Sequence, residues 1–166
     1  MPEGFTITTV TKKDADWVKN LFIRYWGGDI CVSRGKVQNV DDFTGGFSAK
    51  TPEQNIGFIT YTISGTELEI TNLISLKENL GIGSALVETV IDLAKKQSIK
   101  RICLTTTNDN LNGIGFWQKR GFKLVRVYPN AMEYTRKLKP AIPLIGENGI
   151  PLRDELEMDM ILQKEE

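Results

Sequence analysis

The sequence predicts an α/β fold of the α+β kind: a mixed, mostly antiparallel central sheet of about seven strands, flanked by helices. Three observations predict it. Strand-like alternation of apolar and polar residues is more frequent along the chain than helical spacing. A tight turn at Ser64–Gly65 separates two such runs, so these strands pair antiparallel. A helical segment then leads to the run RICLTT, so that crossover gives a parallel pair.

The first half of the chain alternates between strand and helix signals. A strand is predicted over about residues 5–10, where apolar residues alternate with threonines. Thr11 and Asp14 have the spacing of a capping box, and apolar residues follow at helical intervals as far as Tyr25. A short strand with a turn at Gly35, a strand around Phe47, and the two strands of the hairpin at 56–63 and 67–75 complete this half.

The second half begins with a helix that reaches residue 96 or 97, with one apolar face. The strand at 101–106 precedes a helix of about residues 110–120, which ends at Gly121. A strand at 122–127 and a short helix at about 130–138 come next. Residues 129–151 form an extended surface segment, rich in Pro and Gly, before the last strand at 155–162.

Composition and charge narrow the function classes. The chain has 166 residues, which predicts one domain over residues 1–166. Lys+Arg and Asp+Glu number 21 each, so no basic field indicates a nucleic-acid or membrane partner. The first residues lack the basic region and apolar core of a signal peptide, which favours a cytoplasmic location. The chain has no histidine and only Cys31 and Cys103, so we expect no metal site and no histidine-based nucleophile.

Gly81 and Gly83 lie where the strand at 67–75 gives way to the long helix. One interpretation is that they only permit the turn and close packing of the helix. Another is anion binding at the helix N-terminus, where N–H groups are unpaired. A Walker A loop is excluded because no Lys-Ser/Thr pair follows, and a dinucleotide fingerprint is unfavoured because Leu86 takes the place of its third glycine.

Two stretches together resemble the GNAT superfamily of acyl-CoA-dependent N-acetyltransferases. NLISLKENLGIGSALVETVIDLAKK resembles the family's cofactor motif, and TNDNLNGIGFWQKRGF resembles its Asn…Tyr-x-x-x-Gly-Phe motif. Their order and separation, with a strand between them, also fit. The resemblance implies a V-shaped splay between the fourth and fifth main strands, and acetyl-CoA as co-substrate without a metal.

The resemblance also implies roles for individual residues. The backbone of Leu73, Ile74 and Ser75 would pair with the pantetheine arm of the cofactor, as an added strand would. The pyrophosphate would lie against a loop formed by Asn79, Leu80, Gly81, Ile82, Gly83 and Ser84. Asn110 would contact the cofactor arm, and Trp117 stands where the family often has a tyrosine that protonates the leaving thiolate.

This sequence departs from the family pattern, so the group that would protonate the leaving thiolate is not identified by the resemblance. An indole is only an N–H donor, so Trp117 cannot protonate a thiolate. Tyr128, Tyr134 or water are the alternatives. Glu69 resembles the glutamate that serves as general base in several family members, and a solvated surface charge is the other interpretation of this residue. Glu78 replaces the usual Gln or Arg beside the phosphates.

The implied reaction is direct transfer of an acetyl group to a primary amine in a ternary complex, with no covalent enzyme intermediate. The acceptor is a small molecule or a peptide, which the neutral charge balance does not distinguish. A non-catalytic acyl-CoA-binding or regulatory module is the alternative, because Trp117 replaces the usual acid. Residues 129–151 would cover the acceptor site or mediate a homodimer, and the sequence leaves both open.

Overall fold

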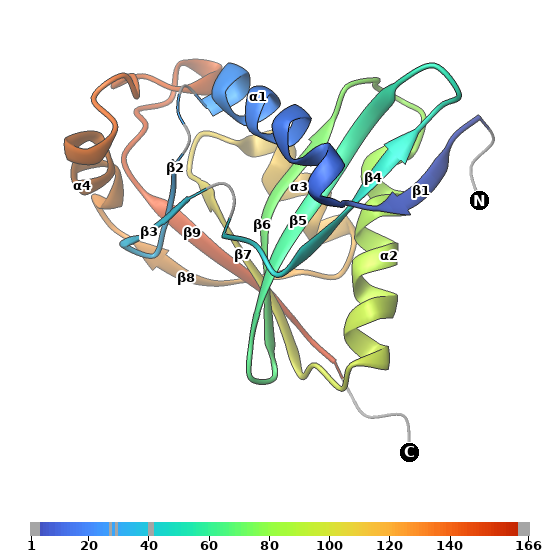
Figure 1. The fold of residues 1–166 in the computed structure, drawn as a ribbon. Coiled ribbons are helices and arrows are strands. Elements are labelled where there is room, and N and C mark those ends of the chain that lie inside the picture. The colour runs from blue at the N-terminus through green and yellow to red at the C-terminus, as the bar shows by residue number, and fades with distance from the viewer. Residues whose placement is uncertain (1–3, 27, 29, 40–41, 163–166) are drawn as a thin grey trace. The chain divides into compact units, whose positions relative to one another are not determined.

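The computed structural model describes residues 4–26, 28, 30–39 and 42–162 (Figure 1). The fold is α/β, with a mostly antiparallel sheet of seven strands, as the sequence predicts. The chain divides into two compact units, of which the first comprises residues 4–21, 42–102 and 161–162 and the second comprises 22–26, 28, 30–39 and 103–160. The predicted splay between the fourth and fifth main strands stays a prediction, as does the single domain.

The first unit is built on four strands in the order β1-β4-β5-β6. Neighbouring strands in this order are antiparallel. The bounds of these elements and of the helices that go with them are β1 Thr6–Thr9, the 3-10 turn η1 Lys12–Asp14, α1 Ala15–Trp26, β4 Gly45–Lys50, β5 Asn55–Ser64, β6 Glu67–Ser75 and α2 Ile82–Lys96. Helix α1 begins in this unit and ends in the second. The predicted bounds of β6 are confirmed.

Local signals start the first helix where they were predicted. The carboxylate of Asp14 accepts the backbone N–H of Thr11 at 2.9 Å, and the N–H of Asp14 donates to the carbonyl of Thr11 at 2.9 Å. Lys50 lies 3.2 Å from the same carboxylate. Burial, the largest single influence, raises the pKa of the Asp14 carboxyl, but the hydrogen bonds that the carboxylate accepts from Thr11 and the nearby charge of Lys50 together lower it below its usual value.

Helices lie on both faces of β5. A Cβ on Gly57 would meet Ile82 of α2 at 2.8 Å, so this side of the strand faces α2. The ring of Phe58, one residue on, contacts Trp17 of α1 edge-on at 5.5 Å between centroids. Alternation along a strand therefore gives β5 one α2-facing and one α1-facing side. The side chains fully buried around it include Ile56, Phe58, Ile59, Leu68, Ile82 and Leu86.

The second unit contains three sheet strands in the order β7-β9-β8 and a separate hairpin, β2–β3. Its elements are β2 Ile30–Ser33, β3 Lys36–Asn39, β7 Arg101–Thr107, α3 Leu111–Lys119, β8 Lys123–Tyr128, α4 Ala131–Leu138, η2 Glu147–Gly149 and β9 Glu155–Ile161. Arg34 and Gly35 are both left-handed, at φ 50° and 72°, as a two-residue hairpin turn requires. The N–H of Arg34 donates to Glu155 at 2.8 Å, which ties the hairpin to β9.

Candidate functional site

The turn between β6 and α2 carries the predicted pyrophosphate loop, and it lies wholly in the first unit. Asn79 and Gly81 are left-handed, at φ 60° and 72°. Gly81 is the N-cap of α2, and its carbonyl accepts the N–H of Ala85 at 3.0 Å. The helical hydrogen bonds begin there, so the N–H groups of the first turn have no intrahelical carbonyl before them. A glycine is needed at position 81 because it takes φ > 0 without a Cβ penalty.

The electrostatics of this turn favour an anion. The first turn of α2 has no acidic residue, so nothing there offsets the positive end of the helix dipole. The basic side chains Lys95 and Lys96 lie in the last turn, where they complement the negative end. Asn79, Leu80 and Gly81 are exposed, Gly83 and Ser84 are half-buried, and Ile82 is buried against β5. The loop backbone is therefore accessible while the helix is anchored beneath it.

The end of β6 leads directly into this loop. Ile74 is buried, Leu73 is half-buried and Ser75 is exposed. The N–H of Leu76 donates to the carbonyl of Ile56 at 2.8 Å, which continues the pairing with β5 past the strand end. The hydroxyl of Ser75 donates to the carbonyl of Lys77 at 2.8 Å and closes the turn. The segment predicted to pair with the pantetheine arm is thus fixed on its β5 side.

Glu69, the third residue of β6, is buried at 8% relative exposure. Its partner across the strand pair is Thr62. Glu67, two residues earlier, is half-buried and pairs with Arg101 at 2.7 Å. The surface-charge interpretation of Glu69 therefore fails on its burial, and its role as a base stays a prediction. Glu69, the end of β6 and the glycine turn follow one another along the chain, and all of them lie in the first unit.

Asn110 lies in the second unit and caps α3. Its Oδ1 accepts the N–H of Gly113 at 3.0 Å, and its Nδ2 donates to the hydroxyl of Thr106 at 2.9 Å. A Cβ on Gly113 would lie 2.2 Å from the Nδ2 of Asn110, so the glycine makes room for the cap. This capping role accounts for an asparagine at the end of β7. Its predicted contact with the cofactor is a further, separate role.

Trp117 is also in the second unit, where it is 7% exposed. Its ring meets Phe116 and Phe122 edge-on, with centroids 5.1 Å away in both cases. Such edge-to-face pairs stabilise packing beyond the area that they bury. These contacts pack the indole against two neighbouring rings, and its contact with the cofactor stays a prediction.

The two tyrosines considered as replacement acids differ. Tyr134 is 48% exposed on α4. The hydroxyl of Tyr128 donates to the Oε2 of Glu157, a buried carboxylate on β9, at 2.7 Å. Its proton is therefore already engaged by an acceptor in this structure.

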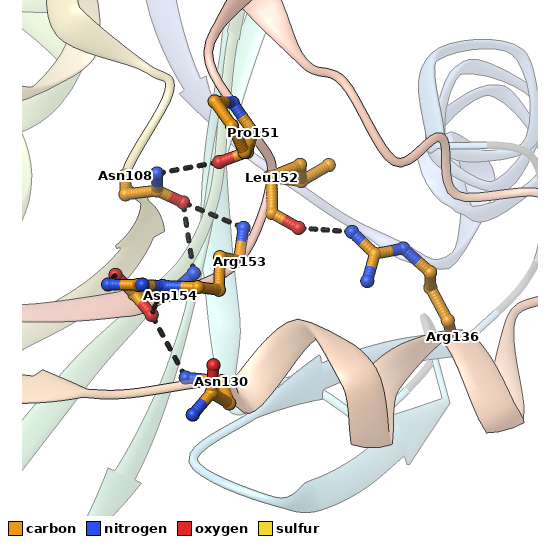
Figure 2. A network of polar contacts seen from close by, with 7 residues as sticks. All are labelled: Asn108, Asn130, Arg136, Pro151, Leu152, Arg153 and Asp154. Carbon is orange, nitrogen blue, oxygen red and sulfur yellow. Dashed lines mark hydrogen bonds and ion pairs between the residues drawn. The ribbon is translucent and has the colours of Figure 1, made fainter.

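A clamp at the end of β7, formed by Asn108 and Asp109, was not found from the sequence. Asn108 donates through Nδ2 to the carbonyl of Pro151 at 2.9 Å and accepts the N–H groups of Arg153 and Asp154 at 3.1 and 3.0 Å (Figure 2). The Oδ1 of Asp154 in turn accepts the N–H of Asn130 at 2.9 Å. The hydrogen-bonded guanidinium of Arg153 is the main cause of a lowered pKa for Asp154. The segment before β9 is thus held from two sides.

The second residue of the clamp, Asp109, is 5% exposed. It accepts the hydroxyl of Thr107 and, at 2.8 Å, the N–H of Glu147. A Cβ on Gly146 would lie 2.0 Å from its Oδ2, so this approach requires glycine. The guanidinium of Arg136 on α4 reaches the carbonyl of Leu152 (Figure 2). The predicted surface segment 129–151 therefore contains a helix and a fixed loop. The polar run TNDN at residues 107–110, which includes Asn108 and Asp109, is the sequence signal for the clamp.

Residues 4–26, 28, 30–39 and 42–162 offer neither a clustered set of metal ligands nor a membrane-spanning helix. No group of three or more Cys, Asp or Glu side chains there is arranged to hold a metal ion. Within the same ranges, none of the helices combines the length and the apolar character that a bilayer crossing demands.

Comparisons with known proteins cover most of the chain. The sequence profile described as "Acetyltransferase (GNAT) family" matches residues 18–122. "Uncharacterized protein YdhI" of Bacillus subtilis (strain 168) is 45% identical over 138 residues, which are 82% of this chain and 86% of that protein.

Two solved structures share the fold. A GNAT family acetyltransferase from Elizabethkingia anophelis with acetyl-CoA bound has a TM-score of 0.68 at 24% identity, over 96% of this chain and 99% of that one. Naa50 of Arabidopsis thaliana, in complex with the bisubstrate analogue CoA-Ac-MVNAL, has a TM-score of 0.70 at 20% identity, with the same two coverages. The profile match, which covers more than half of the sequence, shows that this chain belongs to the acetyltransferase (GNAT) family.

Proposed function

We propose that the protein transfers an acetyl group from acetyl-CoA to a primary amine by direct attack in a ternary complex. The observation that carries the proposal is the glycine turn at the start of α2, where left-handed Gly81 opens a helix end with no acidic residue in its first turn. Family membership makes acyl transfer the expected reaction. The solved structures with bound acetyl-CoA or a CoA-containing bisubstrate analogue support acetyl-CoA as co-substrate.

In this proposal the cofactor runs along one stretch of the first unit. The N–H groups of the turn Asn79–Ser84 hold the pyrophosphate, and the backbone of Leu73, Ile74 and Ser75 pairs with the pantetheine arm. Asn110 and Trp117 are further proposed contacts. No metal is needed, because the reaction consists of positioning two reactants and moving one proton.

Glu69 is the proposed base. The amine nitrogen attacks the thioester carbonyl carbon, the carbon–sulfur bond breaks, and the proton lost by the amine goes to Glu69 or to a water that it orients. The thiol of coenzyme A has a pKa near that of free cysteine, about 8.5, so the thiolate leaves without a strong acid. This agrees with Trp117 at the usual tyrosine position, and water then supplies the proton to the thiolate.

The acceptor is a small-molecule or peptide amine. The Naa50 complex holds a peptide-containing analogue, which supports a peptide amine among the classes to be tested. A release assay for free thiol, run with polyamines, amino acids, aminoglycosides and peptide N-termini, tests the proposal. We expect one class to give turnover well above background hydrolysis. A protein that binds acetyl-CoA tightly but releases no thiol with any of them would instead be an acyl-CoA-binding or regulatory module.

A further inference from the structure

Strand β6 contains a β-bulge at Thr71. Tyr61 of β5 lies opposite Ile70, and the preceding residue, Thr60, lies opposite Asn72. Thr71 is therefore the extra residue, so that two residues of β6 face one of β5.

The bulge decides which residues share a face. Thr60 and Thr62 lie on the same side of β5 as Phe58, which is the side that contacts α1. Glu69 lies opposite Thr62 and Asn72 lies opposite Thr60. These two residues of β6 thus share a face although they are three apart, which regular alternation would forbid. Without the bulge, Asn72 would point to the side that α2 covers.

Thr60 holds the bulge through its side chain. Its residue exposure is 0%, and its hydroxyl lies 2.8 Å from the hydroxyl of Thr71. The same oxygen accepts the Nδ2 of Asn72 at 3.2 Å. One buried hydroxyl on β5 therefore binds both residues of β6 that oppose it. A buried polar atom with two partners specifies this arrangement, because removing it leaves both partners short of a hydrogen bond.

We propose that Thr60 is a positioning residue for acetyl transfer, acting through the bulge on Glu69. This inference rests on the proposed function. The bulge lies between Glu69 and the cofactor-binding stretch Leu73–Ser75, so it sets the rotation of the base relative to the thioester. The cofactor stretch has its own pairs with β5, which are Ile59 with Leu73, Phe58 with Ile74 and Gly57 with Ser75. Loss of the Thr60 hydroxyl therefore affects the base and leaves cofactor binding in place.

The experiment compares three variants in steady-state thiol release with the best amine acceptor. Thr60→Val removes the hydroxyl and keeps the shape, and Thr60→Ser restores the hydroxyl. Ser48→Ala is the matched control, since Ser48 is equally buried on β4 and its hydroxyl pairs with Thr8 at 3.3 Å, away from β6. We expect Thr60→Val to lower kcat about 10-fold with the Kd for acetyl-CoA unchanged, since small misplacements of reacting groups have effects of this order or larger. Thr60→Ser and Ser48→Ala should stay within about 2-fold of wild type.

A double-variant cycle with Glu69→Gln tests whether Thr60 acts on the reaction through Glu69. If Thr60 acts through Glu69, Thr60→Val should have little further effect on kcat in the Glu69→Gln background. An equal loss in both backgrounds, or a folded Thr60→Val protein with wild-type kcat, overturns the inference. So does a crystal structure of Thr60→Val with the bulge unchanged. Wild-type protein that turns over no amine contradicts the proposed function itself, and the role of Thr60 with it.

Discussion

The hydroxyl of Tyr128 and the carboxylate of Glu157 form a 2.7 Å hydrogen bond between β8 and β9. Burial, followed by this hydrogen bond, raises the pKa of Tyr128 above the ordinary 10.0. Because the folded-state pKa is the higher one, the resulting stability is fully present below about pH 10 and is lost as the pH rises through the raised pKa. The hydroxyl donates its hydrogen bond to Glu157, and this engagement argues against Tyr128 as the acid that protonates the thiolate.

Tyr128→Phe tests this assignment. Removal of the donor leaves the buried Glu157 with one hydrogen bond fewer, and we expect the free energy of unfolding to fall by about 1–2 kcal/mol. The measurement is urea denaturation at pH 7. Tyr134→Phe on exposed α4 is the control and should change stability by less than about 0.5 kcal/mol. Turnover should be kept in both variants; a large loss of kcat in Tyr128→Phe alone would return Tyr128 to the chemistry.

Gly83→Asp tests the pyrophosphate site. An acidic residue in the first turn of α2 suits the helix dipole, so the protein without ligand should remain folded. Its carboxylate would repel the phosphates, and we expect the thermal stabilisation by acetyl-CoA to disappear. Gly83→Asn has nearly the same size without the charge and should keep a reduced shift. Wild-type shifts in both variants would mean that the pyrophosphate binds elsewhere.

Glu69→Gln tests the base. We expect kcat/KM to fall by about 10²-fold or more, since general base catalysis contributes at least that much. Binding of acetyl-CoA should be unchanged, and raising the pH should restore part of the rate because more of the amine is then free. Glu67→Gln is the matched control on the same strand, where only a partly exposed ion pair with Arg101 is lost. Equal activity of the two variants would remove Glu69 from the mechanism.

Substitutions at Trp117 test whether its ring acts by packing or takes part in the reaction. Trp117→Ala removes a buried ring that contacts Phe116 and Phe122, and we expect about 3–5 kcal/mol of destabilisation with weaker acetyl-CoA binding. Trp117→Phe keeps an aromatic ring, so most of the activity should remain. Thermal denaturation and acetyl-CoA titration measure the two effects. Full activity and affinity in a folded Trp117→Ala protein would show that the ring lines no part of the cofactor site.

The order of the elements could be predicted because each depends on local signals. The capping pair Thr11–Asp14, the turn at Gly65 and the strand-like run from Glu67 to Ser75 lie within a few residues of the element that they define. The glycine turn was predictable for the same reason. Its resemblance to a family motif supplied a ligand that the spacing of the glycines alone does not specify.

The features that escaped prediction depend on contacts between distant residues. The bulge at Thr71 is fixed by Thr60, eleven residues away on another strand. A hint of it exists in the sequence, since apolar Leu68 and Ile70 are followed by Leu73 and not by an apolar residue at 72. The burial of Glu69 could not be foreseen, because apolar Leu68 and Ile70 on either side of it indicate one covered face, whereas all three residues are buried. Asp109 meets Gly146 and Glu147 only in the folded chain.

The clamp formed by Asn108 and Asp109 divides the segment before β9 into two parts with different tolerance to redesign. Residues 146–154 are held by the clamp, and even a methyl group at Gly146 would collide with the Oδ2 of Asp109. Leu144 and Ile145, immediately before, are 72% and 56% exposed. The carbonyl of Leu144 accepts the N–H of Leu152 at 2.9 Å, and Ile145 forms a β-bridge with Pro151, so foreign sequence grafted into this segment has its natural boundary ahead of Leu144. An insertion before this boundary lengthens an exposed loop. An insertion after it disturbs the contacts of Asn108 and Asp109, which lie next to Asn110, the N-cap of α3.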